Sequence, residues 1–502
     1  MLTRLKIDGF KNLVDVDILL GPFTCFAGGN GVGKSNIFDA IQFLSLMADR
    51  PIADAASQLR NKDDQFHGGP GSVNSLLHSV GGYMADKISL EAEMIIPAEG
   101  VDELGQVAEA AYNFLRYTLI IGRRTSSQSE AKGPFSVLKE ELVPINKSKA
   151  NKHLLFSHAA KWRKEVIIGK RNVPFISTTE GEQGECLINL HQDGGSSGKP
   201  RPFLASKLPR TVLSTARYAS ETPTVLLARR EMQEWKLLHL EPAALRQPDE
   251  LDKFSSNIGL STDGAHLPAT IYRLAKFGKK DESQPKQRIY TQLANRLADL
   301  IPDVKSLHID KDEKRQLLAL NVIERDGTML PAKSLSDGTL RFLALAVLDL
   351  DYTETGLMCL EEPENGIYPD RISAIIELLQ SIPVNPYEEP GEDNPLRQVI
   401  INTHSPKVVY EVPEDSLVYV EQKEFVKHNI RFKATHLSAL SGTWRTEKGK
   451  TPPISKGKLI AYFNLDDNDY DWLRKTPDQE GVKKVKERED LSILKQGKLF
   501  ST

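Results

Sequence analysis

Cysteine is scarce in this chain: Cys25, Cys186 and Cys359 are the only three among 502 residues. No two of them have the close spacing of zinc ligands, and three cysteines provide no disulfide framework. Cys25 and Cys359 lie inside apolar stretches, where a free cysteine behaves as a small hydrophobic side chain. The sequence therefore argues against a disulfide-rich scaffold and against a zinc protein.

Long apolar runs and a strong net charge are also missing. No run approaches the roughly 18 residues of a membrane-spanning helix, and the first ten residues alternate like a strand, without the apolar core of a signal peptide. We therefore expect a cytoplasmic protein that does not associate with membranes. The net charge of −3 argues against a uniformly basic nucleic-acid binder but leaves a local basic groove open. Long heptad repeats are absent, so the sequence does not support a protruding coiled coil.

The composition that remains is typical of a soluble globular protein, with 40% hydrophobic and 26% charged residues. Single cores stop growing near ~250–300 residues, so this length predicts several parts. We expect an N-terminal lobe with a β-rich part at 1–145 and an insert at 146–300 that is first irregular and basic, then helical. A C-terminal lobe of alternating strands and helices follows at 301–420, and residues 421–502 form an extension of unknown role.

The strongest motif is the segment Gly-Gly-Asn-Gly-Val-Gly-Lys-Ser at 28–35, here called the phosphate loop, which fits the pattern G-x-x-x-x-G-K-[ST]. An apolar run at 23–27 predicts a strand before it, and residues 36–44 predict a helix after it. Glycines let backbone N–H groups face phosphate oxygens, and the helix N-terminus adds partial positive charge. Lys34 would reach the β- and γ-phosphates, and Ser35 would bind Mg²⁺. The residues that we assign to nucleotide binding are Gly28, Asn30, Gly31, Gly33, Lys34, Ser35 and Asn36.

A second motif is the apolar run at 356–360, which ends in Glu361 and Glu362. In phosphate-loop ATPases the first acidic residue at such a strand end serves the metal, and the second polarises the attacking water. Neighbouring side chains on a strand point to opposite faces, so both roles require the strand to end at this point. The alternative is an acidic surface turn after a core strand.

In two further segments a polar residue stands at the end of a predicted helix or strand. Ser336 and Gly338 stand where a helix is predicted at 338–350, so they predict either an anion cradle or an ordinary helix cap. His404 follows a buried strand predicted at 398–402, a position where a lone histidine is usually structural.

Taken in order, these motifs resemble the ABC-type (RecA-like) ATPase heads of the SMC and RecF group, and most closely the OLD-like ATPases of bacterial antiphage systems. Four segments carry the resemblance: the opening at 7–12, the signature segment at 335–341, the run at 361–369 and the segment at 403–406. The helical insert of that group is matched by Trp235, Pro242 and Arg246. The resemblance implies an α/β head with an N-terminal antiparallel β subdomain and a helical insert.

The resemblance also implies a mechanism. Two heads associate head to tail, and each ATP with its Mg²⁺ lies between the phosphate loop of one copy and Ser336–Gly338 of the other. Glu362 would activate water, His404 would sense the γ-phosphate, and Asn365 would cross the dimer interface. Glu361 replaces the usual aspartate as metal ligand, which predicts slow turnover. Gln128 is the candidate for the glutamine of the Q-loop.

The implied role is that of an ATPase subunit of an antiphage complex, similar to those of Septu-type and PARIS-type systems. It would form a homodimer or a higher oligomer through its heads and control a separate effector, with a nuclease or toxin as the expected partner. DNA or another nucleic acid is a further candidate partner, and DNA repair of the RecF kind is an alternative role.

Three other interpretations stay open. The pattern Asn61-Lys62-Asp63-Asp64 matches a guanine-binding motif but lies too near the phosphate loop. Residues 417–421 resemble the start of the TOPRIM nuclease domain of OLD proteins, with Asp466, Asp467 and Asp469 as later acidic residues, yet the tail is short and Gln422 replaces the usual glycine. The third interpretation is a scaffold protein that binds ATP and barely hydrolyses it, and it stays open because of Glu361.

The basic residues at 161–164 and 170–171 lie beside an aromatic ring. They predict a nucleic-acid groove or, as we prefer, a solvated face.

Overall fold

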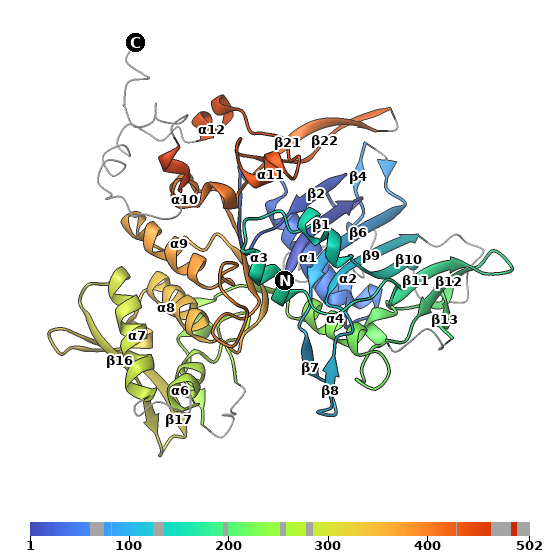
Figure 1. Ribbon diagram of the computed structural model, residues 1–502. Helices are drawn as coiled ribbons and strands as arrows, with labels where there is room; N and C mark the ends of the chain where they lie inside the picture. The colour runs from blue at the N-terminus through green and yellow to red at the C-terminus, as the bar shows by residue number, and fades with distance from the viewer. Residues whose placement is uncertain are drawn as a thin grey trace, which may run out of the picture. The chain divides into compact units, whose positions relative to one another are not determined.

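The computed structural model describes residues 1–60, 75–81, 83–123, 135–193, 199–251, 258–277, 285–427, 429–462 and 483–488. The fold is mixed α/β, as predicted, and the chain divides into two compact units (Figure 1). The first unit contains Met1–Lys236, Val384–Gln398 and Leu417–Ile454. The second contains Leu237–Pro383, Val399–Ser416 and Ser455–Thr502. Among the described residues no helix has the length and apolar character to cross a bilayer.

An eight-stranded sheet dominates the first unit, and every neighbouring pair in it is antiparallel. Alternating sequences such as Phe114–Arg123 bury every second residue over most of their length, as a strand with one solvated face requires. In spatial order the strands are β13 (Arg201–Leu204), β12 (Cys186–Leu190), β11 (Ile176–Glu180), β10 (Phe135–Pro144), β9 (Phe114–Arg123), β6 (Lys87–Ile95), β1 (Leu2–Asp8) and β2 (Val16–Leu19). β1, β2, β6, β9 and β10 lie in the stretch predicted to be rich in strands, whereas β11, β12 and β13 lie in the stretch predicted to be irregular.

The phosphate loop follows a separate strand, β3 (Phe23–Ala27), whose five residues are all buried. β21 (Leu417–Lys427) pairs with β3 in parallel, and β22 (Ile430–Ala439) returns antiparallel to β21. This C-terminal hairpin therefore lies beside the blue N-terminal strands in Figure 1. α1 (Lys34–Met47) leaves the loop and packs on α2 (Ile52–Arg60) and α4 (Pro223–Gln233). The predicted strand and helix around the loop are both confirmed.

Smaller elements complete the first unit: α3 (Ala160–Val166), α11 (Trp444–Glu447) and the hairpins β4 (Ser79–Val80) with β5 (Tyr83–Met84) and β7 (Glu99–Val101) with β8 (Val107–Glu109). α3 carries the basic residues at 161–164. Its Trp162 is 1% exposed, and the ring packs on Phe156 and His158. A buried ring cannot stack on a base, so this segment is the amphipathic, solvated helix face that we preferred.

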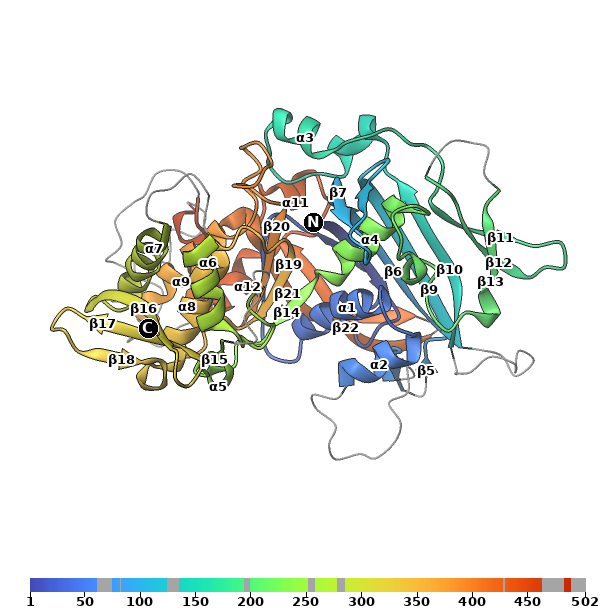
Figure 2. The same cartoon turned by 90° about the horizontal axis from the view of Figure 1, so that it is seen from below.

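The second unit contains the acidic motif. β14 (Lys236–Leu238), β19 (Gly356–Glu361) and β20 (Arg397–Thr403) are neighbours in that order. A small antiparallel sheet has β17 (Leu317–Glu324) at its centre, paired with β15 (Asp249–Glu250), β16 (Val304–Asp312) and β18 (Met329–Pro331). Figure 2 shows α6 (Leu267–Phe277) and α7 (Pro285–Leu300) along this sheet. The remaining helices are α5 (Pro242–Leu245), α8 (Asp337–Leu350), α9 (Ile372–Ser381), α10 (Pro406–Glu411) and α12 (Lys456–Tyr462). The strands predicted at 356–360 and 398–402 and the helix predicted at 338–350 are confirmed.

Candidate functional site

The phosphate loop makes a sharp turn between β3 and α1 in the first unit. Gly33 precedes the helix at φ 110°, and a Cβ atom there would lie 2.1 Å from Thr435 Oγ1. Only glycine fits both this backbone angle and this close approach. Residues 29–31 are exposed, so the outer face of the loop is open to a ligand.

Lys34 is the first residue of α1, and its side chain is folded back over the loop. Its Nζ atom donates hydrogen bonds of 2.7 Å to Gly28 O and to Gly29 O. The residue is only 6% exposed, so the ammonium group is held inside the loop. These carbonyls stand in for the phosphate oxygens that the ammonium would meet. Ser35 is exposed in the first turn of α1.

Side chains that the sequence analysis missed hold this loop from outside. Gln422 Nε2 donates to Gly31 O at 2.9 Å, and Thr435 Oγ1 donates to Val32 O at 2.9 Å. Asn12 links the same parts, because its carbonyl accepts from Thr435 N and its side-chain oxygen accepts from Asn36 Nδ2. The C-terminal hairpin therefore fixes the carbonyls of Gly31 and Val32.

The same contacts bear on the nuclease interpretation. Residues 417–421, which resemble the start of a TOPRIM domain, are part of the strand that pairs with β3. Gln422, which replaces the glycine of such a domain, binds the phosphate loop instead. Glu421 forms an ion pair with Lys423 at 3.3 Å. Asp466, Asp467 and Asp469 lie outside the described residues.

The hairpin contacts lead to a first prediction. Gln422→Ala combined with Thr435→Val should weaken ATP binding by up to roughly thirtyfold, since two hydrogen bonds worth about 1 kcal/mol each preorganise the loop. Titration calorimetry with ATP would measure the effect. Lys433→Ala, an exposed change on the same hairpin, should bind like the parent. Unchanged affinity in the double variant would show that the hairpin does not hold the loop in its binding form.

The acidic motif of the second unit lies where β19 ends. Glu361 is the last residue of the strand, and Glu362 has φ 45°, which turns the chain sharply. Because the chain turns here, the two neighbouring carboxylates need not point to opposite faces of the strand. Their predicted roles at one site require this freedom. Glu361 Oε1 accepts from Asn402 Nδ2 at 3.2 Å, and Glu362 N donates to Asn402 O at 3.0 Å. The end of β20 thus holds both glutamates.

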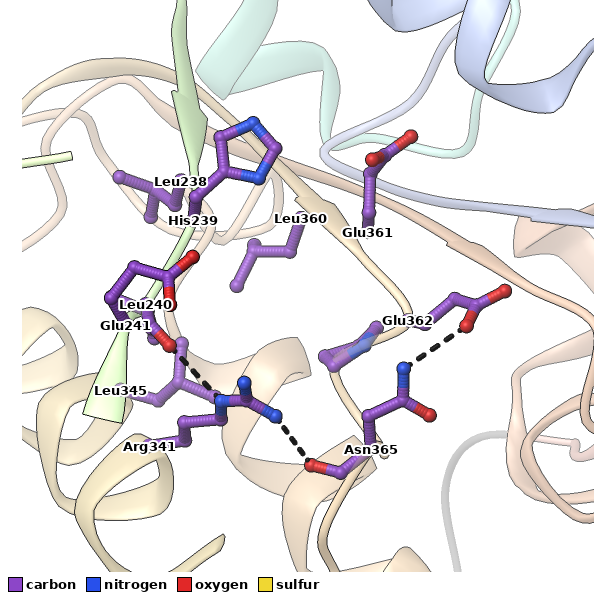
Figure 3. Close-up of a pocket in the computed structure, with 11 residues that line it drawn as sticks. Leu238, His239, Leu240, Glu241, Arg341, Leu345, Leu360, Glu361, Glu362 and Asn365 are labelled. Carbon is purple, nitrogen blue, oxygen red and sulfur yellow. Dashed lines mark hydrogen bonds between the residues drawn. The ribbon is translucent and has the colours of Figure 1, made fainter. Parts of the chain in front are cut away.

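The Glu362 carboxylate has two further partners in this unit. His404 Nδ1 lies 2.6 Å from Oε1, and Asn365 Nδ2 donates to Oε2 at 3.0 Å, as Figure 3 shows for Asn365. The His404 side chain is 46% exposed, so it is not a satisfied core histidine. The structure thus brings together three residues to which the resemblance assigned separate roles.

Residues 335–341, the signature segment, contact the acidic loop at 362–366. Ser336 caps α8, because its Oγ accepts from Thr339 N. A Cβ atom on Gly338 would lie 2.1 Å from Gly366 O. Arg341 donates from Nε to Leu240 O at 3.0 Å and from Nη1 to Asn365 O at 2.9 Å (Figure 3). Arg341 therefore holds the backbone of the residue whose side chain binds Glu362.

A cavity of about 120 Å³ opens beside these contacts. Arg341, Glu361, Glu362 and Asn365 line one part of it, and β14 with its following residues lines another (Figure 3). Arg246, one of the residues that carry the resemblance, donates to Leu335 O at 2.9 Å and pairs with Asp337. Its charge offsets the carboxylate at the start of α8, which would otherwise repel an anion there.

The predicted site residues are divided between the units. Those of the phosphate loop and Asn36 belong to the first unit, and Ser336, Gly338, Glu361, Glu362 and His404 belong to the second. Mg²⁺ in nucleotide sites usually takes one or two protein oxygens and fills its shell with phosphates and water. The hydroxyl of Ser35 and the carboxylate of Glu361 fit that donor set. No group of three His, Cys, Asp or Glu residues in the described ranges is arranged to hold a metal alone. Gln128 and the Asn61–Asp64 pattern fall outside those ranges.

Comparisons with known proteins agree with these motifs. A family model described as "AAA domain, putative AbiEii toxin, Type IV TA system" matches residues 23–95 and 200–409, more than half of the chain. Proteins named DNA replication and repair protein RecF are similar over short segments. That of Parabacteroides distasonis is 34% identical over 67 residues, and that of Bacteroides thetaiotaomicron is 36% identical over 67. Each match covers 13% of this chain and only 18% of the relative.

Among solved structures, an Smc head bound to the C-winged helix domain of ScpA covers 88% of this chain, and 98% of its own chain is matched, at 12% identity and a TM-score of 0.42. The SMC head domain of Thermotoga maritima covers 88%, with 99% of its chain matched, at 12% identity and a TM-score of 0.34.

Proposed function

The chain belongs to the AAA-domain family whose model it matches, and we propose that it hydrolyses ATP with Mg²⁺ between two copies of itself. The observation that carries this proposal is the cluster of Glu362, His404 and Asn365 in one unit, in a chain whose other unit has an intact phosphate loop. A phosphate loop alone supports binding, and the cluster adds a carboxylate that is held ready to act on water.

Each residue would have a distinct part. Lys34 leaves the loop carbonyls and neutralises charge on the β- and γ-phosphates, while loop N–H groups bind the remaining oxygens. Glu362 accepts a proton from the attacking water, with Asn365 fixing one carboxylate oxygen and His404 the other. Mg²⁺, held by Ser35 and Glu361, would supply the charge compensation that phosphoryl transfer needs.

The dimer is part of the same proposal. Ser336 and Gly338 stand at the N-terminus of the 14-residue helix α8, which favours an anion. In the proposed head-to-tail dimer this end of one copy would bind the γ-phosphate of ATP held by the other copy. ATP would thus hold the two heads together, and hydrolysis would release them. Glu361, one methylene longer than aspartate, would make this turnover slow.

For the biological role, we propose a cytoplasmic subunit of an antiphage complex that controls a separate nuclease or toxin. The family's description names a toxin of a type IV toxin–antitoxin system, which supports a toxic output. The local similarity to RecF favours a second candidate, an ATPase of DNA repair with DNA as its partner. A built-in nuclease is less favoured, because residues 417–422 serve the phosphate loop.

One experiment separates these candidates. The purified chain is incubated with supercoiled plasmid, ATP and Mg²⁺ or Mn²⁺, and nicking and phosphate release are followed together. We expect phosphate release with intact DNA, which would mean that another protein delivers the output. Stimulation of turnover by DNA would favour the repair role. Nicking that is lost in Glu421→Ala or Asp467→Ala would contradict the proposal and indicate a compact nuclease in the tail.

A further inference from the structure

Glu364 is a buried carboxylic acid between the two loops of the proposed catalytic cluster. It follows Glu362 by two residues and is 8% exposed. Its Oε1 atom accepts a hydrogen bond from Thr403 Oγ1, and its carbonyl accepts from Ile367 N at 2.9 Å. The side chain thus joins the acidic loop to the end of β20, immediately before His404.

Thr403 extends this contact to the other side of His404. The same Thr403 Oγ1 atom that donates to Glu364 accepts from Ser405 N at 2.9 Å. The backbone before and after His404 is therefore fixed through one hydroxyl group, and that hydroxyl is fixed by Glu364. His404 in turn meets Glu362 at 2.6 Å.

The hydrogen bond between Glu364 and Thr403 is here called the clamp, and the surroundings of Glu364 raise the pKa of its carboxyl group. Burial raises the pKa of its carboxyl group, and the nearby Glu362 carboxylate raises it further, while Thr403 and His404 act in the opposite direction. Its Oε2 atom is buried and has no hydrogen-bond partner among the described residues. The protonated form of this carboxyl would place no buried negative charge beside Glu362, whose side chain is 28% exposed.

We propose that Glu364 is a positioning residue for ATP hydrolysis, which holds Thr403 and thereby sets His404 against Glu362. The inference rests on the proposed ATPase function. Misplacing a catalytic group by about 1 Å can cost on the order of a hundredfold in rate, whereas contacts that bind the nucleotide elsewhere are untouched. Loss of the clamp should therefore lower kcat and leave the KM for ATP nearly unchanged.

The test measures kcat and KM for ATP in Glu364→Ala, Glu364→Gln and Thr403→Val. Glu364→Ala and Thr403→Val should each lose roughly 10- to 100-fold in kcat, with KM within about threefold of the parent. Glu364→Gln should keep most of the parent's kcat, because its amide oxygen accepts the same hydrogen bond without charge. The double variant Glu364→Ala/Thr403→Val should be no slower than either single one, since both break the same link.

Asp370→Ala, an exposed change a short way along the chain from Glu364, serves as the matched control and should behave like the parent. Parent-like kcat in Glu364→Ala, additive losses in the double variant, or a loss that Glu364→Gln does not restore would each overturn the inference. The parent and Glu362→Gln are measured alongside. Turnover in the parent that Glu362→Gln abolishes shows that the ATPase proposal stands whatever Glu364 does, whereas no turnover in the parent overturns both.

Discussion

Lys34→Ala is expected to lower the affinity for ATP by roughly a hundredfold or more. The ammonium group would make charge-assisted hydrogen bonds to two phosphates, each worth about 1.5–3 kcal/mol, and 1.4 kcal/mol corresponds to a factor of ten. In the present structure Nζ is 2.7 Å from two loop carbonyls, so it is already beside the position of a phosphate. No other lysine or arginine lies within the loop itself to replace it.

Binding of a fluorescent ATP analogue, competed with ATP, would measure this loss. Lys87→Ala, an exposed change on β6 of the same unit, is the matched control and should bind like the parent. Because Lys34 is buried, a thermal melt should accompany the measurement to show that the variant is folded. A folded Lys34→Ala protein with parent affinity would mean that the phosphate loop is not the nucleotide site.

The phosphate loop could be predicted because its information is local. An apolar strand, a glycine-rich turn and a helix follow one another in the chain, and each part constrains the next. The same holds for β19, whose apolar run ends at Glu361, and for α8, which begins directly after its cap Ser336. Such segments carry their structure in the order of their residues.

The groups that support the loop could not be predicted in this way. Gln422 and Gly31 are 391 positions apart, and nothing in either segment indicates the other. Gln422 reaches the loop because β21 pairs with β3. This pairing of two apolar strands is a tertiary contact that neither segment specifies alone. The sequence around Gln422 resembles a nuclease motif, and a resemblance this short carries no information on which strand pairs with it.

The three missed strands have a different cause. β11, β12 and β13 contain four or five residues each and are separated by polar stretches rich in glycine. The composition of this stretch as a whole therefore indicates irregular structure, although its three short strands belong to the eight-stranded sheet. The opposite error concerns Trp162. Its basic neighbours indicate a surface segment, whereas the ring itself is buried in the core.

Glu362→Gln is expected to lower ATP turnover by about 10²- to 10⁴-fold, the usual contribution of a general base, and to leave ATP binding intact. Glutamine has the size of glutamate, and its amide oxygen still accepts from Asn365 Nδ2 or faces His404. It cannot take a proton from water. ATP would then persist, and if ATP holds two heads together, the variant should accumulate as a dimer.

Phosphate release gives the turnover, and light scattering with and without ATP gives the mass in solution. Glu313→Gln, an exposed change in the same unit, controls for the loss of one carboxylate and should match the parent in both measurements. Equal turnover in Glu362→Gln and the parent would refute the catalytic role. If both proteins assemble with ATP and neither hydrolyses it, the chain is a scaffold that ATP assembles. The longer side chain of Glu361 would then explain the absence of hydrolysis. Glu361→Asp should in that case restore turnover, because the shorter carboxylate returns the metal ligand that related ATPases use.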